Sequence, residues 1–313
     1  MSNRILVTGG AGFIGSNLCE QLLKKGHSVV TIDNLRTGKE ENVPAGVEFF
    51  NQDLGKPSSL SVLNNRKFDV IIHLAGQSSG EISFEDPVYD INANTVSTIN
   101  LIEYARKTNV KHFIYASSMS VYGGQTVEQV SENSPCYPLS YYGVGKLSSE
   151  KYLDVVSGTY KLNTTALRFF NVYGPHQNLS NLKQGMVSIY LAQLLTYQKI
   201  LVKGSLNRFR DFIFIDDVVE AIIHTIENEK TYSQRINVGT GSKTTVRDLI
   251  DSMFSAIGKK VEVVEAEGTL GDQNGIYADV TLMNNLIGYK AQISLKEGMA
   301  RMVKWAMENG NSK

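Results

Sequence analysis

Tyr142 and Lys146 stand four residues apart, a spacing that places two side chains on one face of a helix. A free tyrosine hydroxyl has a pKa of about 10 and is a poor base at neutral pH. A neighbouring ammonium favours the phenolate, which can then take the proton of a hydroxyl group. A serine hydroxyl, such as that of Ser117 or Ser118, can hydrogen-bond the same oxygen. Tyr141 adjoins Tyr142, but of the two only Tyr142 has a lysine at this spacing; a purely structural pair is the alternative.

The start of the chain indicates what would hold a ligand against this pair. An apolar, β-branched run at 4–8 predicts a strand, and GGAGFIG follows at 9–15. Apolar residues at helical spacing then lead to Gly26, and a second apolar run at 29–32 ends on Asp33. A strand, a glycine turn, a helix and a strand, with an acid about 20 residues past the glycines, are typical of dinucleotide binding.

Each glycine of this turn has its own physical role. Gly9 allows a tight turn off the strand, Gly12 lets a pyrophosphate approach the main chain, and Gly15 lets the helix pack closely on the sheet. The helix N-terminus offers unpaired N–H groups to the phosphates. Asp33 would accept hydrogen bonds from a ribose diol and repel a 2′-phosphate, which favours NAD over NADP. The positive nicotinamide ring would then also favour the phenolate of Tyr142. An ordinary glycine turn in an α/β protein is the alternative.

Strands and helices alternate along the first half of the chain, which predicts a Rossmann-type, doubly wound parallel sheet of the α/β class. Further strands are predicted at 48–51, 70–74, 112–116, 166–171 and 211–215. Helices are predicted at 58–64, 94–107, 186–197, 217–229, 246–257 and 296–308. Because ligands bind at the carboxyl ends of parallel strands, we expect one crevice to be formed by the loops at 9–15, 33–35, 75–79 and 117–118.

The regular alternation of predicted strands and helices ends near Asn171. We therefore expect an NAD-binding Rossmann domain at 1–170, rejoined by about 211–238, and a smaller α/β domain for the substrate within 171–313.

Composition narrows the class of partner. The 313 residues carry 31 basic and 31 acidic side chains, so nucleic acid and membrane surfaces are not expected partners. The two cysteines, Cys19 and Cys136, form neither a disulfide framework nor a metal cluster, and no metal is expected. Met1 runs directly into a strand, and no apolar run is long enough to span a membrane. A cytoplasmic location is the prediction.

These motifs resemble those of the extended short-chain dehydrogenases/reductases, specifically the NAD-dependent nucleotide-sugar epimerase/dehydratase family of the UDP-glucose 4-epimerase-like type. The resemblance runs nearly end to end. It rests on TGGAGFIG at 8–15, DNL at 33–35, HLAG at 73–76, Ser118, Tyr142 with Lys146, LRFFNVYGP at 167–175 and RDFI at 210–213.

The resemblance implies a site residue by residue. Ser118, Tyr142 and Lys146 would be catalytic, Ser118 because the family's Ser/Thr lies three residues before the Val of Val-Tyr-Gly. The implied NAD-binding residues are Gly9, Gly12, Phe13, Ile14, Gly15, Asp33, Asn34, Leu35, Asp53, Leu54, Leu74, Ala75, Gly76, Asn94, Ser117, Tyr142 and Lys146. The implied substrate-binding residues are Gln77, Ser78, Ser118, Asn171, Arg210 and Asp272. An ion pair with Asp211 is the alternative role for Arg210.

The resemblance also suggests a reaction. Family members transfer a hydride from sugar C4 to NAD⁺, giving a 4-keto sugar. The 4,6-dehydratases place an Asp-Glu pair where this chain has Met119 and Ser120, and the decarboxylases usually have Glu at the second position. A 4-epimerase that retains NAD and acts on a UDP-sugar is therefore favoured. A dehydratase, a decarboxylase, a simple 4-dehydrogenase and a non-catalytic NAD-binding regulator remain as alternatives.

One departure from the family concerns the diphosphate. Many relatives have Arg-x-Gly-Asp near the C-terminus, where this chain has Thr269 followed by Leu, Gly and Asp272. Arg208 and Lys203 are possible replacements for the missing cation. The resemblance further implies a homodimer that pairs helices around 94–107 and 142–157.

Overall fold

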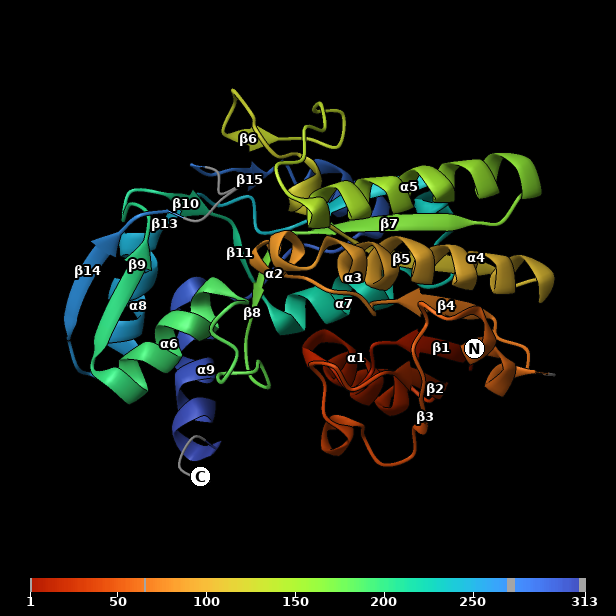
Figure 1. Cartoon of the computed structure of the whole chain (residues 1–313), viewed down its shortest axis with the longest axis horizontal. Helices are drawn as coiled ribbons and strands as arrows, with labels where there is room; N and C mark the ends of the chain where they lie inside the picture. The colour runs from red at the N-terminus through yellow and green to blue at the C-terminus, as the bar shows by residue number, and fades with distance from the viewer. Residues whose placement is uncertain (1, 65, 269–273, 310–313) are drawn as a thin grey trace.

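A seven-stranded parallel sheet lies at the centre of the molecule (Figure 1). The computed structural model describes residues 2–64, 66–268 and 274–309. The strand order is β12-β7-β5-β4-β1-β2-β3, and every neighbouring pair is parallel. The strands are β1 (Arg4–Thr8), β2 (Ser28–Asp33), β3 (Glu48–Asn51), β4 (Val70–His73), β5 (His112–Ser118), β7 (Thr164–Phe169) and β12 (Gln234–Val238). The predicted doubly wound α/β fold is confirmed.

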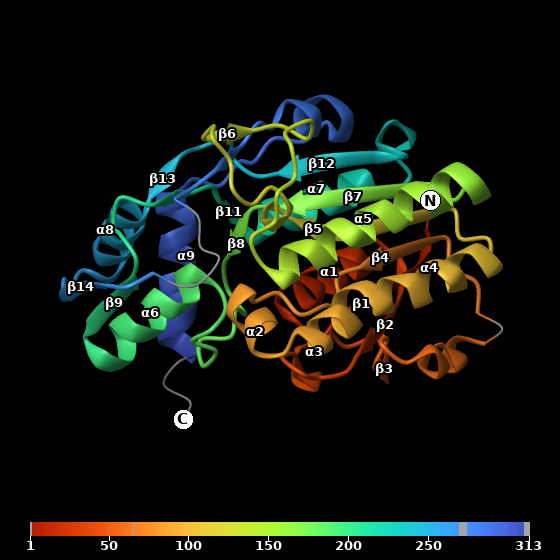
Figure 2. The ribbon, with the colours of Figure 1, turned by 45° about the horizontal axis from the view of Figure 1, so that its top comes forward.

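Helices cover both faces of this sheet because side chains of a strand alternate in direction. Ile5 and Val7 of β1 belong to the core that α1 (Phe13–Lys24) and α7 (Ile215–Thr225) cover. Leu6 belongs to the opposite core, which is covered by α4 (Ser97–Lys107) and α5 (Tyr141–Tyr160). Helices α4 and α5 run beside each other along that face (Figure 2). Two short helices, α2 (Gly80–Glu85) and α3 (Pro87–Ile91), lead through a π-helical turn at Asn92–Val96 into α4.

The second half of the chain adds smaller pairs of strands. These are β8 (Asn171–Tyr173) with β11 (Phe212–Phe214), β9 (Lys199–Lys203) with β14 (Glu262–Ala266), β10 (Phe209–Arg210) with β13 (Thr244–Thr245), and β6 (Gln129–Val130) with β15 (Tyr277–Ala278). Helices α6 (Met186–Tyr197), α8 (Val246–Ile257) and α9 (Leu295–Asn309) pack near β9 and β14, away from β1 (Figure 1). Short 3₁₀ segments lie at Glu40–Asn42, Pro57–Leu63, Met119–Val121 and Glu229–Thr231, and a π-helical segment lies at Met283–Ile287.

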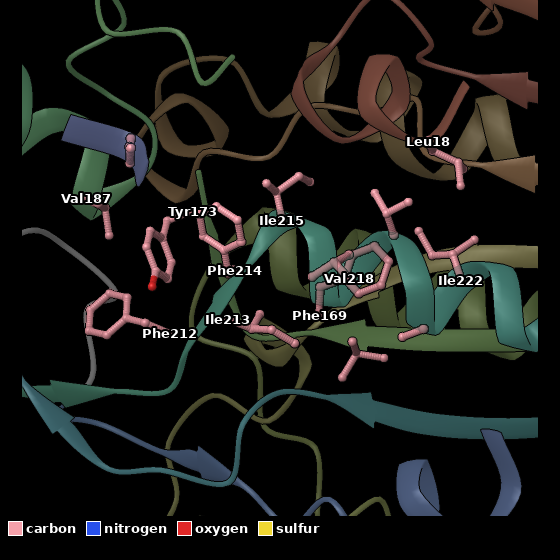
Figure 3. Packing of buried hydrophobic residues seen from close by; sticks show 14 of the residues in the cluster. Leu18, Phe169, Tyr173, Val187, Phe212, Ile213, Phe214, Ile215, Val218 and Ile222 are labelled. Carbon is pink, nitrogen blue, oxygen red and sulfur yellow. The ribbon is translucent and has the colours of Figure 1, made fainter. Parts of the chain in front are cut away.

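One apolar core joins the two halves. It runs from Leu18 of α1 through Val218 of α7 to Tyr173 of β8 and Val187 of α6 (Figure 3). The rings of Tyr173 and Phe214 meet edge to face at a centroid distance of 5.5 Å. This shared core fixes the smaller strand pairs against the carboxyl end of the large sheet. The division into domains at 1–170 and 171–313 stays a prediction.

Several predicted boundaries need correction. The strand expected at 166–171 is two strands, β7 and β8, on either side of Phe170. The helix expected at 217–229 begins at Ile215 and ends at Thr225, because Ile226 is extended and Glu227 has a φ of 56°. The short helix expected at 58–64 is a 3₁₀ segment at Pro57–Leu63.

Candidate active site

A cavity of about 590 Å³ opens where the carboxyl ends of β1, β2, β4 and β5 meet the second half of the chain. Parallel strands end on one side of a sheet, which explains why loops far apart in sequence converge here. The predicted NAD-binding residues on its wall are Gly9, Gly12, Phe13, Ile14, Gly15, Asp33, Asn34, Asp53, Leu54, Leu74, Ala75, Gly76, Ser117, Tyr142 and Lys146. The predicted substrate residues on its wall are Gln77, Ser78, Ser118, Asn171 and Arg210.

Two of the described residues that were predicted for the site, Leu35 and Asn94, do not line this wall. Leu35 contributes instead to the turn after β2, where its N–H donates to Asp33 Oδ1 at 2.8 Å. Asn94 is buried behind the wall, and its amide donates to the carbonyl oxygen of Gln77 at 3.0 Å and to Asp90 Oδ1 at 3.1 Å. Asp272 lies outside the described residues, as does Thr269. Asn94 supports the wall from behind because it is buried in the π-helical turn Asn92–Val96 that precedes α4.

The glycine turn leaves an open cradle at the cavity. Gly9 has a φ of +76°, and a Cβ there would lie 2.8 Å from the backbone nitrogen of Ala75. A Cβ on Gly15 would lie 2.1 Å from the carbonyl oxygen of Gly9, so only glycine fits between helix and turn. A Cβ on Gly12 would meet only that same oxygen, at 3.3 Å, and would otherwise extend into open space. Gly12 is also the N-cap of α1 and offers no side-chain cap to the first N–H groups.

Asp33 places a carboxylate at the tip of β2. The side chain is 8% exposed, and its pKa is raised by burial although backbone N–H groups oppose the shift. Asp33 Oδ2 accepts a hydrogen bond from Ala11 N at 3.1 Å, and Oδ1 accepts the bond from Leu35 N. These bonds orient the carboxylate on the cavity wall, ready to accept further bonds from hydroxyl groups.

Helix α5 presents the tyrosine and the lysine together. Ser140 caps the helix, its hydroxyl accepting a hydrogen bond from Gly143 N at 3.1 Å, so that Tyr142 falls in the first turn and Lys146 one turn later. Both side chains are buried at the cavity wall. Lys146 Nζ donates to the carbonyl oxygen of Ala116 at 2.9 Å and lies 5.8 Å from the ring centroid of Tyr142.

Ser118 ends β5 beside this pair. Its hydroxyl donates to Ser120 Oγ at 3.2 Å and accepts a hydrogen bond from Ser120 N. A hydrogen bond with Ser118 lowers the pKa of the Tyr142 phenol. The structure therefore brings Ser118, Tyr142 and Lys146 to one place, although β5 and α5 are separated by a long loop in the sequence.

Burial, however, outweighs these favourable neighbours. Burial raises the pKa of Tyr142 to about 12, and the negative charge of Asp90 raises it further. Burial lowers the pKa of Lys146 to about 8, against the opposing effect of the Asp90 and Glu150 carboxylates. Without NAD, the protein holds Tyr142 as a neutral phenol, because the cost of burying a phenolate dominates. The predicted phenolate requires the positive nicotinamide ring as well as Lys146.

Arg210 is a buried cation on the cavity wall. It is 5% exposed, its Nη1 donates to the carbonyl oxygen of Phe209 at 2.7 Å, and burial lowers its pKa to about 10, with Arg208 adding to the effect. It therefore stays charged at neutral pH. The Asp211 carboxylate accepts hydrogen bonds from the backbone N–H groups of Thr240, Gly241 and Ala278 and from the Thr240 hydroxyl.

Several residues on the wall were not predicted from the sequence. Arg36 lies over the ring of Tyr89, with its Cζ atom 4.8 Å from the centroid, at the Asp33 end of the cavity. Ser120 and Tyr190 also line the cavity. No residue-type pattern marks these two residues, because they come from a 3₁₀ turn and from α6. The two proposed replacement cations, Arg208 and Lys203, do line the cavity.

The described part of the chain contains no group of three or more His, Cys, Asp or Glu side chains that could hold a metal ion. Among the same residues, no helix has the length and apolar character that crossing a bilayer requires.

The geometry agrees with an independent comparison of the sequence. Residues 5–239 match the family described as the NAD dependent epimerase/dehydratase family. The chain belongs to this family. Its cofactor is NAD.

Known members of the family are similar along their whole length. The UDP-glucose 4-epimerase of Mycolicibacterium smegmatis is 36% identical over 308 residues, which cover 96% of this chain and 98% of the relative. The UDP-glucose 4-epimerase of Thermotoga maritima, solved with UDP-glucose, has a TM-score of 0.95 and 32% identity, covering 98% of this chain and 100% of that one. The Thermus thermophilus UDP-glucose 4-epimerase in complex with NAD has a TM-score of 0.90 and 33% identity, covering 98% and 99%.

The residues of this family member fit NAD. The open side of Gly12 at the uncapped N-terminus of α1 provides a cradle suited to a pyrophosphate. The oriented carboxylate of Asp33 suits a ribose diol. Both features lie on one continuous wall with Tyr142 and Lys146.

Proposed function

We propose that this protein is an NAD-dependent 4-epimerase of UDP-sugars that regenerates its bound NAD in each cycle. The observation that supports this most strongly is the grouping of Ser118, Tyr142 and Lys146 on the cavity wall, followed in the chain by Met119 and Ser120. The first three side chains supply what oxidation and reduction at a sugar hydroxyl require. The next two offer no carboxyl group for a further elimination.

Each catalytic side chain has a separate task in this proposal. NAD⁺ held at the Gly12 turn and at Asp33 would supply a hydride acceptor, and its positive nicotinamide ring would favour the phenolate of Tyr142. Tyr142 takes the proton of the sugar C4 hydroxyl and later gives it back to the C4 oxygen of the 4-keto sugar. Ser118 donates a hydrogen bond to that oxygen, and Lys146 favours the phenolate and holds the nicotinamide ribose. The 4-keto sugar turns within the cavity, so that hydride returns to its opposite face.

The residues after Ser118 argue against two alternatives. Dehydration and decarboxylation on this scaffold need an added acid or base near the sugar. Met119 is an apolar thioether, and Ser120 carries only an aliphatic hydroxyl. Neither exchanges a proton readily near neutral pH. A simple dehydrogenase would use the same three residues, but it would release a keto product with net reduction of NAD.

The cavity offers cations for the diphosphate of the substrate. Arg210, Arg208 and Lys203 all line it, as does Asn171. We assign the diphosphate to this group, with Arg208 and Lys203 taking the place of the arginine that many relatives have at the position of Thr269. Gln77 and Ser78 also line the cavity, and their polar side chains suit contacts with sugar hydroxyls.

The proposal includes a homodimer. Tyr141, Val144, Tyr152 and Val155 of α5 are each at least 44% exposed and recur at helical spacing. Val88, at the start of α3 on the same side of the sheet, is also exposed. A second copy covering this stripe would bury an apolar surface of the kind that soluble monomers rarely leave in water.

A panel of nucleotide sugars tests the reaction. Purified protein is incubated with UDP-, dTDP-, GDP- and CDP-sugars, and the products are followed by NMR. We expect inversion at C4 of a UDP-sugar with no net NADH. Loss of the C6 hydroxyl, release of CO₂ or stoichiometric NADH would contradict the epimerase assignment.

Tyr142→Phe tests the role of the phenol. Removing the hydroxyl leaves no group to move the proton, so we expect kcat to fall by about 10³-fold or more, while NAD stays bound. Tyr141→Phe is the matched control, because Tyr141 is the neighbouring, exposed tyrosine, and its ring contact with Phe84 survives the change. Equal activity of the two variants would refute the assignment.

A further inference from the structure

Glu150 carries a buried carboxylate that the proposed mechanism does not use. It lies on α5, one helical turn beyond Lys146, and is 1% exposed. Its Oε1 accepts hydrogen bonds from Ser117 Oγ at 2.5 Å and from Arg168 Nε at 2.9 Å. Its Oε2 accepts one from Arg168 Nη2 at 2.7 Å and lies 3.2 Å from Arg235 Nε. The carboxylate is thus surrounded by donors from three different strands.

The donors connect the elements that form the site. Ser117 immediately precedes Ser118 at the end of β5, Arg168 is on β7, and Arg235 is on β12. Glu150 itself belongs to the helix that carries Tyr142 and Lys146. One side chain therefore fixes the spacing between the serine on the sheet and the tyrosine and lysine on the helix.

Burying two charges, those of Glu150 and Arg168, is a costly way to hold a helix on a sheet. The desolvation of a buried ion pair offsets most or all of its attraction, and apolar side chains of similar volume often stabilise a fold as well or better. Arg168 is 2% exposed, so this cost applies in full to its pair with Glu150. Unlike apolar contacts, the two hydrogen bonds from Arg168 and the one from Ser117 fix the Glu150 carboxylate in a single orientation.

We propose that Glu150 is a positioning residue that holds the Ser118 end of β5 in register with Tyr142 and Lys146 on α5. The inference rests on the proposed function of these three residues. Small errors in such a register matter, because reacting groups misplaced by about 1 Å can lose about a hundredfold in rate.

Glu150 also acts on Lys146 through its charge. The groups that face Lys146 are Asp90 on α3, Tyr142 on its own helix and Tyr115 on β5, whose ring lies 4.9 Å from Nζ. The neutral imidazole of His73 on β4 lies close enough for Lys146 to lower its pKa. The carboxylates of Asp90 and Glu150 both raise the pKa of Lys146 and so keep it protonated. Removing either one lets Lys146 lose its proton at lower pH.

Three variants separate position, charge and fold. Ser117→Ala cuts the link to β5 and leaves both arginine contacts in place. Glu150→Gln removes the charge. Asp154→Asn is the control, because Asp154 contacts Arg235 at the exposed, outer end of the same network. For each purified holoenzyme we would measure kcat, KM for the UDP-sugar, the rate of reduction of bound NAD at 340 nm, NAD affinity, the pH profile and thermal unfolding.

We expect Ser117→Ala to lower the reduction rate about tenfold at saturating NAD, with KM for the UDP-sugar and the unfolding temperature close to wild type. We expect Glu150→Gln to move the alkaline limb of the pH profile to lower pH as well, and Asp154→Asn to change nothing. A fall in unfolding temperature with an unchanged rate and pH profile would show a purely structural role and overturn the proposal. So would a rate loss in Ser117→Ala that disappears at saturating NAD.

Two further readouts keep the test independent of folding losses and of the proposed function. If Glu150→Gln does not fold, Ser117→Ala decides. Hydrogen exchange of the 112–121 segment needs no substrate: faster exchange there in Ser117→Ala, but not in Asp154→Asn, supports the positioning role, and equal exchange overturns it. If bound NAD is reduced but no epimer forms, the epimerase proposal is wrong, while the reduction rates still decide the role of Glu150.

Discussion

Replacing two glycines of the first turn by alanine should affect different properties: stability for Gly15→Ala, and NAD affinity for Gly12→Ala. In Gly15→Ala the new methyl would lie 2.1 Å from the carbonyl oxygen and 2.7 Å from the carbonyl carbon of Gly9. Both atoms are backbone, so the clash is relieved only if α1 moves away from the turn. In Gly12→Ala the nearest atom is 3.3 Å away, and the Gly12 φ of −85° suits any residue. The methyl therefore fits the protein but occupies the cradle that faces the cavity.

The magnitudes follow from these contacts. Overpacking of a close contact typically costs about 1–3 kcal/mol, and we expect Gly15→Ala to reach the upper end because no side chain can yield. For a chain of this size, about 3 kcal/mol corresponds to a fall of roughly 5 °C in the unfolding temperature. Gly12→Ala should change stability by less than about 1 kcal/mol. The added methyl group should displace the pyrophosphate of NAD from backbone N–H groups, whose hydrogen bonds to it contribute about 1.5–3 kcal/mol each. The affinity for NAD should therefore fall by about a hundredfold.

The assay pairs calorimetric NAD titration with thermal unfolding of the NAD-free protein. Gly158→Ala is the control, since a Cβ there meets nothing within 4 Å and alanine favours the α5 helix by about 0.5–1 kcal/mol. We expect low NAD affinity with normal stability for Gly12→Ala, and low stability for Gly15→Ala. Wild-type NAD affinity in Gly12→Ala would refute the assignment of this cradle to the pyrophosphate.

Three shorter predictions follow. Asp33→Asn should weaken NAD at least tenfold and narrow its advantage over NADP in a binding titration, because the carboxylate that accepts ribose hydroxyls and repels a 2′-phosphate is gone; tighter binding of NADP than NAD by wild type would contradict this. Burial lowers the pKa of His73 to about 3, so below about pH 6.5 the unfolded chain binds a proton that the folded chain does not, and the free energy of unfolding falls. Urea unfolding at pH 7 and pH 5 measures this fall, which should be about 2 kcal/mol smaller in His73→Gln than in wild type. Val155→Glu should yield monomers in light scattering, and Tyr197→Glu, at an equally exposed site on α6, should not.

Much of the site could be predicted because local patterns encode local geometry. The turn with Gly9, Gly12 and Gly15 must follow a strand and begin a helix, and a Tyr-Lys spacing of four fixes a shared helix face without knowledge of the rest. The family resemblance added Ser118, which no local pattern singles out. The alternation of strands and helices predicted a parallel sheet, and so predicted that the loops after four of its strands converge at one edge.

The sequence was least informative where tertiary contacts decide a side chain's surroundings. Asn94 lies in the π-helical turn before α4, where its amide donates to Gln77 and Asp90 and does not line the cavity, so its contact with NAD stays a prediction. Burial of Tyr142 raises the pKa of its phenol by more than the neighbouring Ser118 lowers it, so the predicted phenolate also requires the charge of the nicotinamide ring. Burial depends on everything packed around a group, which the spacing along one helix does not contain.

The sequence alone determined the strand–turn–helix that binds a dinucleotide and the helical face shared by Tyr142 and Lys146, since both depend on residues close together in the chain. The tertiary structure alone decided that Glu150 meets Ser117, Arg168 and Arg235, and that residues from α6 and β9 complete the cavity. These contacts join segments up to 85 residues apart, counted from Glu150 to Arg235. Their geometry is set by how the sheet and the shared core bring distant segments together, so no local pattern of residues records it.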